Sequence, residues 1–524
     1  MMTFSLFARA AKPFLLPALL VIATGAALSV GFGGSMAVAQ AAPAPDPAGF
    51  SERLRPRLVP AGSEIAHSLE DRMVHYRVPG VAVAVIAQGD VVYAAGFGVQ
   101  QAGGDATVDS DTLFSAGSVS KLATASLILR LTAQDRLDLD ANVFDSVQAW
   151  SLPAGSAFAG SPVTLRMILS HTAGFNLHGF ADFQPGEPLP TLLDTLTGTG
   201  AADHEPLQLI FEPGSAYRYS GGGYELAELL VSEAMGSAYP AIARTHLFEP
   251  LILSRSTFAN PLPEDSGNIA RAHNDRGEAV ALPRGYESMP EMAASGLWTT
   301  ARDLGTLIAA LMDSYQGEAE ALLPPDLATQ MLSRVAPSEH GLGPRLSGSG
   351  ENFIFHHGGS NDSYQSWVEG HLATGDGLVV LTNGARGREL AAEIRNAVAD
   401  TMGWAVNAPV HVPELDLPGA TLTAYAGVYG VDSDFTHHHR NQMVGWIFEA
   451  DLEVREDGQG GIGLGRAGRD LFDPLLPLSP TRFAVPGFAQ PVGIAEVDFH
   501  RDAFGQTTGM TLRLDNAESH YLRR

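Results

Sequence analysis

Ser118 stands three residues before Lys121, and a serine and a lysine at this spacing can form and break an acyl bond. The pair opens an apolar run with helical periodicity, and on a helix residues i and i+3 share one face. The partial positive charge of a helix N-terminus favours an ionised serine and a neighbouring oxyanion. The pair therefore predicts the nucleophile of a covalent acyl hydrolase, although Ser-x-x-Lys also occurs at ordinary exposed helix starts.

The scarcity of lysine in this chain draws attention to Lys121. The sequence has 32 lysines and arginines, and only Lys12 and Lys121 are lysines. An arginine stays charged in proteins, whereas a lysine amine can lose its proton near neutral pH. Lys121 is therefore the amine in the body of the chain that can take part in proton transfer.

The composition is that of a large globular protein. A length of 524 residues is enough for two or three domains, and a hydrophobic content of 45% is typical of a globular protein. The net charge of −26 argues against nucleic acid and anionic lipid surfaces as partners, because both need basic patches. Since the chain has no cysteine, it has no disulfide and no thiolate metal site.

Residues 1–39 are expected to be a secretory signal peptide. Arg9 and Lys12 precede an apolar stretch at residues 14–30, and Ala37 and Ala39 form an Ala-x-Ala cleavage site. An uncleaved membrane anchor is the alternative, because the apolar stretch is long for a signal peptide. We expect an exported protein, periplasmic or extracellular, in which the Pro- and Ala-rich residues 40–60 form a linker.

Residues 61–405 predict an α/β domain that is built around a sheet. Apolar runs at residues 81–87 and 91–99, on either side of Gly89-Asp90, predict a β-hairpin that follows a helix at residues 65–73. The first run is apolar throughout, so we expect its strand to be buried on both faces between helices. Three later strands and a helix return the chain to this sheet, which makes the middle a helical insertion. They lie near residues 353, 366, 378 and 390.

The C-terminal part has a different pattern. Residues 406–417 are a second Pro-rich linker, and residues 418–524 contain short alternating runs separated by turn residues. This pattern is typical of an all-β domain, either a small antiparallel barrel or a sandwich. The histidine tract at residues 437–439 lacks a carboxylate or a spaced partner, so we do not expect a metal site there. We expect neither a metal nor a cofactor in this protein.

Two further stretches are candidates for the cleft. His171 follows a short amphipathic helix, and a histidine at a helix end usually binds the carbonyl groups there, so we expect a structural role. Residues 221–223 are three glycines in a loop that leads into a helix at residues 225–235. Consecutive glycines allow the backbone to pass close to another segment.

Three stretches, taken in order, resemble the motifs of the serine β-lactamase and penicillin-binding protein superfamily. The likeness is greatest to class C β-lactamases and their esterase and D-stereospecific peptidase relatives, and it covers roughly residues 65–402. The resemblance implies a β-lactamase-like transpeptidase fold, in which helices flank an antiparallel sheet. The C-terminal domain resembles the lipocalin-like domain appended to many of these proteins. The three motifs read Ser118-x-x-Lys121, Tyr219-Ser220-Gly221 and His357-Gly358-Gly359.

The resemblance also implies roles for individual residues. Ser118 would attack a carbonyl carbon, while Lys121 and Tyr219 share the transfer of its proton. The oxyanion would lie between the backbone N–H groups of Ser118 and Ser360. A small-molecule or peptide acyl substrate would be the partner. The residues implied in substrate binding are His357, Gly358, Gly359 and Gly221.

Two departures from the family pattern affect the expected substrate. Gly221 stands where the family usually has an asparagine that binds an amide side chain. His357 replaces the lysine that many members use to hold a substrate carboxylate, and a histidine is only partly charged at neutral pH. Both favour small esters and D-amino-acid amides or peptides. The alternatives are a β-lactamase or D,D-carboxypeptidase and, in another class, a non-catalytic penicillin-binding sensor or scaffold.

Overall fold

The computed structural model describes residues 45–524, apart from residues 184–185, 414, 433–450, 459, 469–471, 487–494 and 515–516. The expected signal peptide and the histidine tract at residues 437–439 lie outside the described residues. None of the helices in the described part of the chain is long and apolar enough to cross a membrane.

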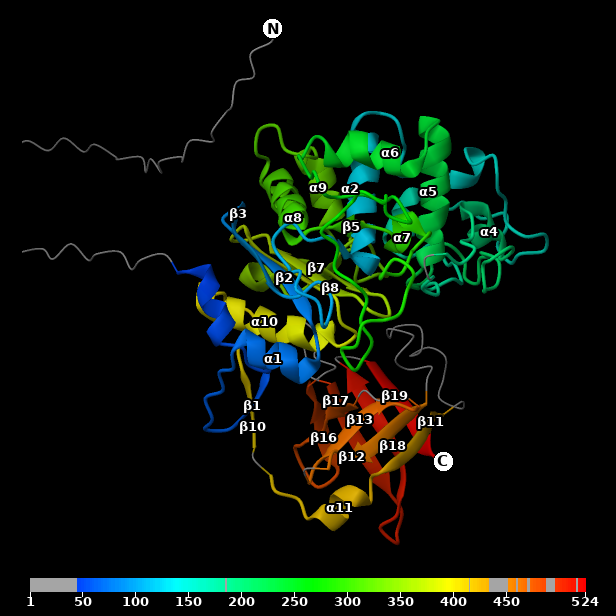
Figure 1. Cartoon of the computed structure of the whole chain (residues 1–524). Helices are drawn as coiled ribbons and strands as arrows, with labels where there is room; N and C mark the ends of the chain where they lie inside the picture. Colours follow the sequence, from blue (N-terminus) through cyan, green and yellow to red (C-terminus); the bar gives the residue numbers. More distant parts are fainter. Residues whose placement is uncertain are drawn as a thin grey trace, which may run out of the picture. The chain divides into compact units, whose positions relative to one another are not determined.

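A six-stranded sheet forms the centre of the first domain (Figure 1). The strand order is β3-β2-β9-β8-β7-β6, and every neighbouring pair is antiparallel. The predicted hairpin is present as β2 and β3, and β9 pairs with the other edge of β2, so the beginning and end of the domain share one sheet. The strands are β2 (Gly80–Ala87), β3 (Asp90–Gly98), β6 (Arg345–Ser347), β7 (Ile354–Ser360), β8 (Gln365–His371) and β9 (Asp376–Thr382).

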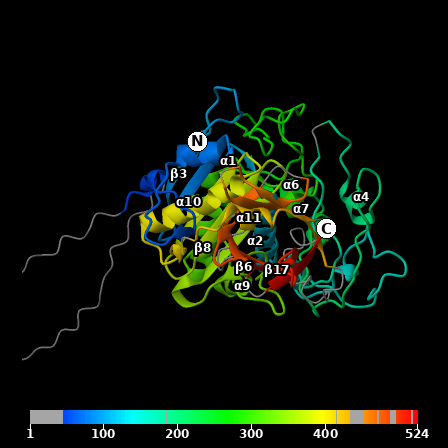
Figure 2. The same cartoon turned by 90° about the horizontal axis from the view of Figure 1, so that it is seen from below.

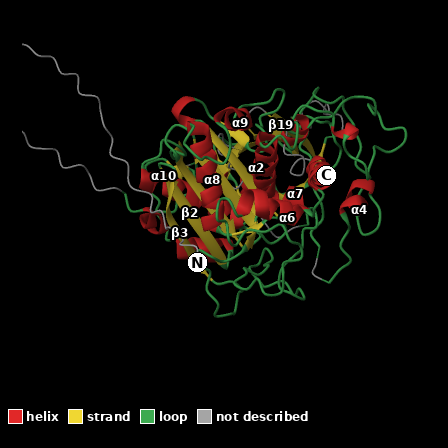
Figure 3. Ribbon diagram, turned by 90° about the horizontal axis from the view of Figure 1, so that it is seen from above, coloured by secondary structure: helices red, strands yellow, loops and turns green. Residues whose placement is uncertain are grey.

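Helices cover both faces of this sheet, as the apolar run of β2 predicts. Figures 1 and 3 show α8 (Ala301–Gln316) on one face, and α1 (Leu69–Tyr76) and α10 (Gly387–Met402) lie on the other. Successive side chains of β2 enter two separate hydrophobic cores because a strand alternates its faces. Val81, Val83 and Val85 pack with α1 and α10, whereas Ala82, Ala84 and Ile86 pack with α8.

Helix α1 begins at Leu69, four residues later than the spacing of apolar residues predicts. Ser68 caps it, because its side chain accepts the N–H of Asp71 at 3.0 Å, and a capping serine stops the helix from extending further back. The view from below shows α1 beside α10 (Figure 2). Arg72 of α1 makes two hydrogen bonds of 2.6 and 2.7 Å to the carboxylate of Glu393 of α10, which joins the two helices.

The helical insertion carries the elements that build the site. The central one is α2 (Ser120–Ala133), in which eleven of fourteen residues are buried, and it contacts α7. A two-stranded antiparallel sheet of β4 and β5 joins the entrance of α2 to the segment that follows α7. The other elements are β4 (Phe114–Ser115), α3 (Leu165–Leu169), α4 (Leu192–Thr197), α5 (Gly221–Met235), α6 (Tyr239–Ala243), α7 (Met292–Ser295), β5 (Trp298–Thr299) and α9 (Pro325–Met331).

The prediction of a loop at residues 221–223 is wrong, because the three glycines form the first turn of α5. Ser220 caps this helix by accepting the N–H of Gly223 at 3.1 Å. The expected close approach is nevertheless present. A Cβ atom on Gly222 would lie 2.6 Å from Leu207 and 2.8 Å from Leu177. Glycine thus allows α5 to begin against the neighbouring loop.

The two Pro-rich segments expected as linkers each contribute a short strand. β1 (Leu58–Pro60) and β10 (Val410–Val412) pair in parallel, with Val59 opposite His411. Ahead of β1, a 3-10 turn (Pro47–Glu52) buries Phe50 completely in the core of α1 and α10. The segments on either side of the first domain are therefore paired with each other.

The C-terminal part of the chain is an antiparallel β domain, as predicted. Nine strands lie in its described residues, in the order β14-β13-β12-β11-β19-β18-β17-β16-β15. The two outer strands, β14 and β15, are separated in sequence by Leu475 alone, so the sheet curves back on itself into a nearly closed barrel. Its strands are β11 (Gly427–Val431), β12 (Leu452–Glu456), β13 (Ile462–Arg466), β14 (Phe472–Pro474), β15 (Leu476–Pro477), β16 (Arg482–Val485), β17 (Ala495–Arg501), β18 (Thr507–Leu514) and β19 (Ala517–Arg523).

Candidate active site

Ser118 lies in a tight 3-10 turn, η2 (Gly117–Val119), directly before α2. Within residues 112–129, every residue except Ser118 is buried. Gly117 makes the turn with a φ of 51°, a left-handed conformation that glycine adopts without strain. The fold therefore presents one hydroxyl group to the cleft from an otherwise buried segment.

Lys121 lies under Ser118 and is almost fully enclosed. Its side chain is 1% exposed, and its Nζ atom is 3.4 Å from Ser118 Oγ. Nζ donates a 2.9 Å hydrogen bond to the carbonyl oxygen of Ala294 in α7. The rings of Tyr219 and Tyr224 lie 4.9 and 5.5 Å from Nζ. The amine is thus held between a carbonyl group, two aromatic rings and the serine.

His171 fixes the segment that carries Tyr219. Its Nδ1 accepts the N–H of Ser220 at 3.1 Å, and its carbonyl oxygen accepts the N–H of Arg218 at 2.9 Å. The imidazole stacks on the Tyr219 ring at a centroid distance of 4.2 Å. The expectation that this histidine binds carbonyl groups at its helix end is wrong, because the ring turns to the tyrosine loop. Burial and the nearby Lys121 charge lower the pKa of His171 well below its usual value.

The end of β7 packs against the loop that precedes Ser118. Ser366 Oγ donates a 2.7 Å hydrogen bond to the carbonyl oxygen of Ala116, and Asn361 Nδ2 donates one of 2.7 Å to Ser115 Oγ. Gly359 lies so close to Ala116 that any side chain at this position would collide with its carbonyl oxygen. These contacts fix the end of β7 and the start of β8 relative to the nucleophile.

The amide of Ser360 lies beside the Ser118 turn. A Cβ atom on Gly117 would be 2.9 Å from the Ser360 nitrogen, which locates that amide next to η2. Ser118 itself lies at the start of the helical segment, where backbone N–H groups have no helical partner. The Ser360 amide therefore lies beside the turn that carries Ser118.

His357 enters the same cleft as a neutral side chain. Its Nδ1 lies 2.7 Å from the carbonyl oxygen of Gly358, and a carbonyl only accepts, so Nδ1 carries the proton. Its Nε2 has no hydrogen-bond partner among the described residues. Burial, followed by the charge of Lys121, lowers the pKa of His357 to about 3. At neutral pH His357 therefore supplies no positive charge for a carboxylate.

The segment at residues 178–180 explains the glycine at position 221. A Cβ atom on Gly221 would lie 2.8 Å from Cε2 of Phe180 and 3.1 Å from the carbonyl oxygen of His178. Both residues, together with Arg345 of β6, line the cavity that contains Ser118 and Lys121. These three lining residues were not predicted, because none of them carries a spacing signal that relates it to a motif. The cavity also includes Tyr219, Gly221, His357, Gly358, Gly359 and Ser360.

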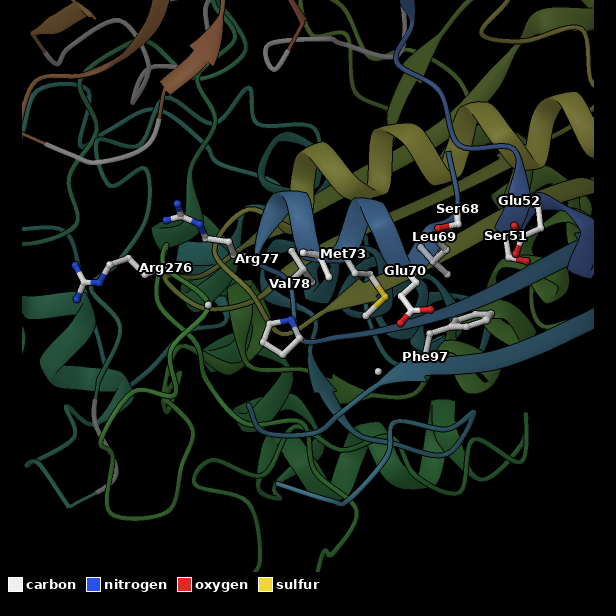
Figure 4. Close-up of a pocket in the computed structure, with 14 residues that line it drawn as sticks. Ser51, Glu52, Ser68, Leu69, Glu70, Met73, Arg77, Val78, Phe97 and Arg276 are labelled. Carbon is white, nitrogen blue, oxygen red and sulfur yellow. The ribbon is translucent and has the colours of Figure 1, made fainter. Parts of the chain in front are cut away.

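A second cavity, of about 680 Å³, lies between α1 and the C-terminal end of β3 (Figure 4). Arg77 and Arg276 lie at one end, Glu52 lies at the other, and Met73 and Phe97 line the space between them. Its lining lacks a paired nucleophile and base. Across the described residues of the whole chain, no group of three metal-ligating side chains is placed to hold a metal ion. The Ser118 cavity is therefore the candidate active site.

Comparison with known proteins agrees with this geometry. The family model described as Beta-lactamase matches residues 65–402, which is more than half of the chain. The chain belongs to the β-lactamase family. Members of this family are generally serine hydrolases, and the matched range covers all three motifs of the cleft.

Relatives within the family share modest identity with the chain. Penicillin-binding protein 4 of Amycolatopsis lactamdurans is 29% identical over 209 residues, which are 40% of this chain and 51% of that protein. A Beta-lactamase of Lysobacter lactamgenus is 27% identical over 261 residues, 49% of this chain and 62% of that protein. The matches thus span less than two thirds of either relative.

Two solved structures have the same fold. The octameric penicillin-binding protein homologue from Pyrococcus abyssi gives a TM-score of 0.55 at 23% identity, over 86% of this chain and 98% of that one. SurE with D-Leu gives a TM-score of 0.53 at 21% identity, over 87% and 97%. At this level of sequence identity, the similarity shows a shared fold alone.

Proposed function

We propose that this β-lactamase-family protein is a serine hydrolase that works through an acyl-enzyme on Ser118 and acts on small esters or D-amino-acid amides and peptides. The observation that carries the proposal is the buried Lys121 amine, 3.4 Å from the hydroxyl of Ser118, which is the one residue of its segment that is not buried. A non-catalytic scaffold has no need to bury a lysine under a serine, since burial of a charged amine is unfavourable.

The reaction begins when Ser118 Oγ attacks the substrate carbonyl carbon. Lys121 and Tyr219 together accept the hydroxyl proton and return it to the leaving alcohol or amine, which leaves Ser118 acylated. Charge develops on the carbonyl oxygen, between the N–H groups of Ser118 and Ser360. Loss of one such donor typically costs about 10²–10³ in rate. Water then attacks the acyl group, releases the acid and restores the serine hydroxyl.

The proposed substrate class follows from the neutral charge of His357 in the third motif. His357, with a pKa lowered to about 3 by burial and then by the Lys121 charge, holds no positive charge at neutral pH. Gly221 is packed against Phe180 and leaves no room for the amide side chain usual in the family. Substrates that lack a carboxylate near the scissile bond are therefore favoured over β-lactams and D,D-peptides. The relative named Unguisins hydrolase ungD, 23% identical over 245 residues, supports activity on bonds other than those of β-lactams.

Covalent labelling tests the nucleophile, and substrate comparison tests the specificity. Purified protein should gain one fluorophosphonate adduct at Ser118 by peptide mass spectrometry and should cleave p-nitrophenyl acetate faster than nitrocefin. S118A should do neither. Absence of both an adduct and turnover in the wild type would refute the hydrolase, whereas faster nitrocefin hydrolysis would replace the ester or D-peptide assignment with a β-lactamase.

Export remains part of the proposal. The apolar leader at residues 14–30 and the Ala-x-Ala site that ends at Ala39 support secretion to the periplasm or beyond. Fractionation of cells followed by N-terminal sequencing tests it. The expected mature protein begins at Gln40, and an intact Met1 in the membrane fraction would instead support an uncleaved anchor.

A further inference from the structure

Side chains of α5 hold the N-terminus of α7, the short helix that binds Lys121. The first N–H groups of an α-helix have no partner within the helix. Glu225 accepts the N–H of Ala294 at 3.1 Å, and Glu228 accepts the N–H of Ala293 at 2.9 Å. The two glutamates are three residues apart on α5 and share a face. Two carboxyl groups thus fix consecutive amides of α7.

The carbonyl groups of the same two α7 residues bind the lysine face of α2. Ala294 accepts the 2.9 Å hydrogen bond from Lys121 Nζ, and Ala293 accepts one of 2.8 Å from Thr124 Oγ1. Lys121 and Thr124 are also three residues apart. Helix α7 is therefore a bridge with two connections, which lead from the two glutamates of α5 to the amine beneath Ser118.

This arrangement is unusual as a simple helix cap. Both glutamates are at most 1% exposed, and Glu225 Oε2 has no hydrogen-bond partner among the described residues. Burial and repulsion from neighbouring carboxyl groups raise the pKa of Glu225 well above its usual value, and burial raises that of Glu228 to about 8. The capping residue of α7, Glu291, makes no side-chain cap in the described structure. Two buried acids are thus used where one local cap would suffice.

The geometry points to Glu225 and Glu228 as positioning residues that hold α7 so that the Ala294 carbonyl keeps the Lys121 amine directed at Ser118. This role rests on the proposed function, since it concerns the base of that reaction. Neither glutamate is placed to touch a substrate, because α7 and Lys121 lie between them and the serine.

Several charged or titratable groups face the two glutamates and decide how they respond to pH. From α2 comes the Lys121 ammonium, and from the start of α7 comes Glu291, whose pKa burial raises to about 8. Tyr239 of α6 faces them as a neutral phenol, because burial raises its pKa well above the usual value. The raised pKa values of both glutamates favour their protonated forms, and ionisation at alkaline pH places negative charge near the ammonium.

The test compares alanine and glutamine variants at both positions with a matched control. Glutamine keeps the acceptor oxygen for the α7 amides and cannot ionise. E233A is the control, because Glu233 lies on the same helix and accepts the N–H groups of Gln148 and Ala149 at 2.7 and 2.8 Å, away from the cleft. The readout is the second-order rate of fluorophosphonate acylation at Ser118, followed by intact mass from about pH 6 to about pH 9.

E225A and E228A should acylate roughly tenfold to a hundredfold more slowly than E233A at neutral pH, because a misdirected base loses efficiency. E225Q and E228Q should stay within about threefold of the wild type there. Near pH 8 and above, their rates should diverge from that of the wild type, because the amide cannot ionise as the Glu228 carboxyl does.

Equal rates in E225A, E228A and E233A would overturn the positioning role, as would glutamine profiles that coincide with the wild type at every pH. If the alanine variants fail to fold, the glutamine profiles decide alone. Failure of the proposed hydrolase is distinguishable from failure of this inference, because in that case the wild type itself forms no adduct.

Discussion

Lys121 donates a 2.9 Å hydrogen bond to the carbonyl oxygen of Ala294, and this bond orients the buried amine. A neutral amine keeps two hydrogens, so it can still donate to that carbonyl while its lone pair faces Ser118 Oγ at 3.4 Å. An ammonium donates a hydrogen bond to the same carbonyl oxygen and can return a proton toward Ser118 Oγ. The single acceptor therefore serves both protonation states of the base.

Replacement of Lys121 by methionine should abolish most activity without unfolding the protein. Methionine fills a similar space and removes the amine, and loss of a general base typically costs about 10²–10⁴ in rate. We expect K121M to acylate slower by this factor, as measured with p-nitrophenyl acetate and fluorophosphonate. Its melting temperature should equal or exceed that of the wild type, because an unfavourable buried charge is gone. Wild-type rates in K121M would exclude Lys121 from proton transfer.

Alanine at Gly359 should impair the oxyanion hole, whereas alanine at the adjacent glycine should do so far less. A side chain on Gly359 would collide with the carbonyl oxygen of Ala116 and push β7 away from the nucleophile. At Gly358 the nearest atom to a new Cβ is 3.7 Å away, on Trp367. We expect G359A to lose about 10²-fold or more in acylation rate.

The loss in G358A should be at least about tenfold smaller than in G359A. Circular dichroism of both variants controls for the fold. Similar losses in the two variants would contradict this view of β7.

Asparagine at Gly221 should destabilise the protein through Phe180. The new Cβ would lie 2.8 Å from the Phe180 ring, so G221N should lower the free energy of unfolding by about 1–3 kcal/mol. In G221N/F180A the ring is absent and the two effects should not add. Urea titrations of the wild type, both single variants and the double variant measure the coupling. Strictly additive effects would show that Phe180 does not exclude a side chain at position 221.

Glu228 should make stability depend on pH, and glutamine should remove part of that dependence. Burial raises the pKa of Glu228 to about 8 in the folded protein, against an unfolded value of 4.5. Between these values the folded state keeps a proton that the unfolded state releases, so stability decreases as pH rises from about 4.5 to about 8. Relative to the wild type, the melting temperature of E228Q should therefore be higher at pH 8 than at pH 5.

The pH dependence of the difference between E228Q and the wild type is the decisive quantity, because any constant effect of the amide cancels. Melting curves at four or five pH values across this range, in one buffer system of constant ionic strength, measure it. A difference that does not change with pH would mean that Glu228 is ionised in the folded protein at neutral pH.

Local patterns of the sequence were sufficient for much of the fold. The hairpin of β2 and β3 and the burial of β2 on both faces follow from the apolar run at residues 81–87, because a strand between two helical layers has no polar face. The antiparallel C-terminal domain follows from its short alternating runs. The Ser118 and Lys121 pair was predicted from its spacing, since helical geometry directly relates residues i and i+3, together with the scarcity of lysine and the order of the three motifs.

Contacts between distant segments account for what the sequence did not reveal. The bond from Ser220 to His171 joins residues 49 positions apart, and nothing near His171 indicates it. The start of α5 at Gly221 was missed because glycine usually opposes helix formation, whereas here tight packing against Leu177 requires it. The pairing of β1 with β10 was missed because Pro-rich segments resemble linkers. Only the assembled fold shows that these two segments pair with each other.

The burial of Lys121 also determines how this protein reacts with reagents that modify amines. Lys12 lies outside the described residues, and Lys121 is 1% exposed, so the described part of the chain offers no accessible lysine side chain. Aldehyde fixatives and succinimidyl esters, which depend on accessible amines, find no lysine side chain to modify on the surface that residues 45–524 present in their described part. A single lysine introduced at an exposed arginine would therefore be the one accessible lysine side chain of the described residues, to which a fluorophore or a solid support could be attached while the cleft stays unmodified.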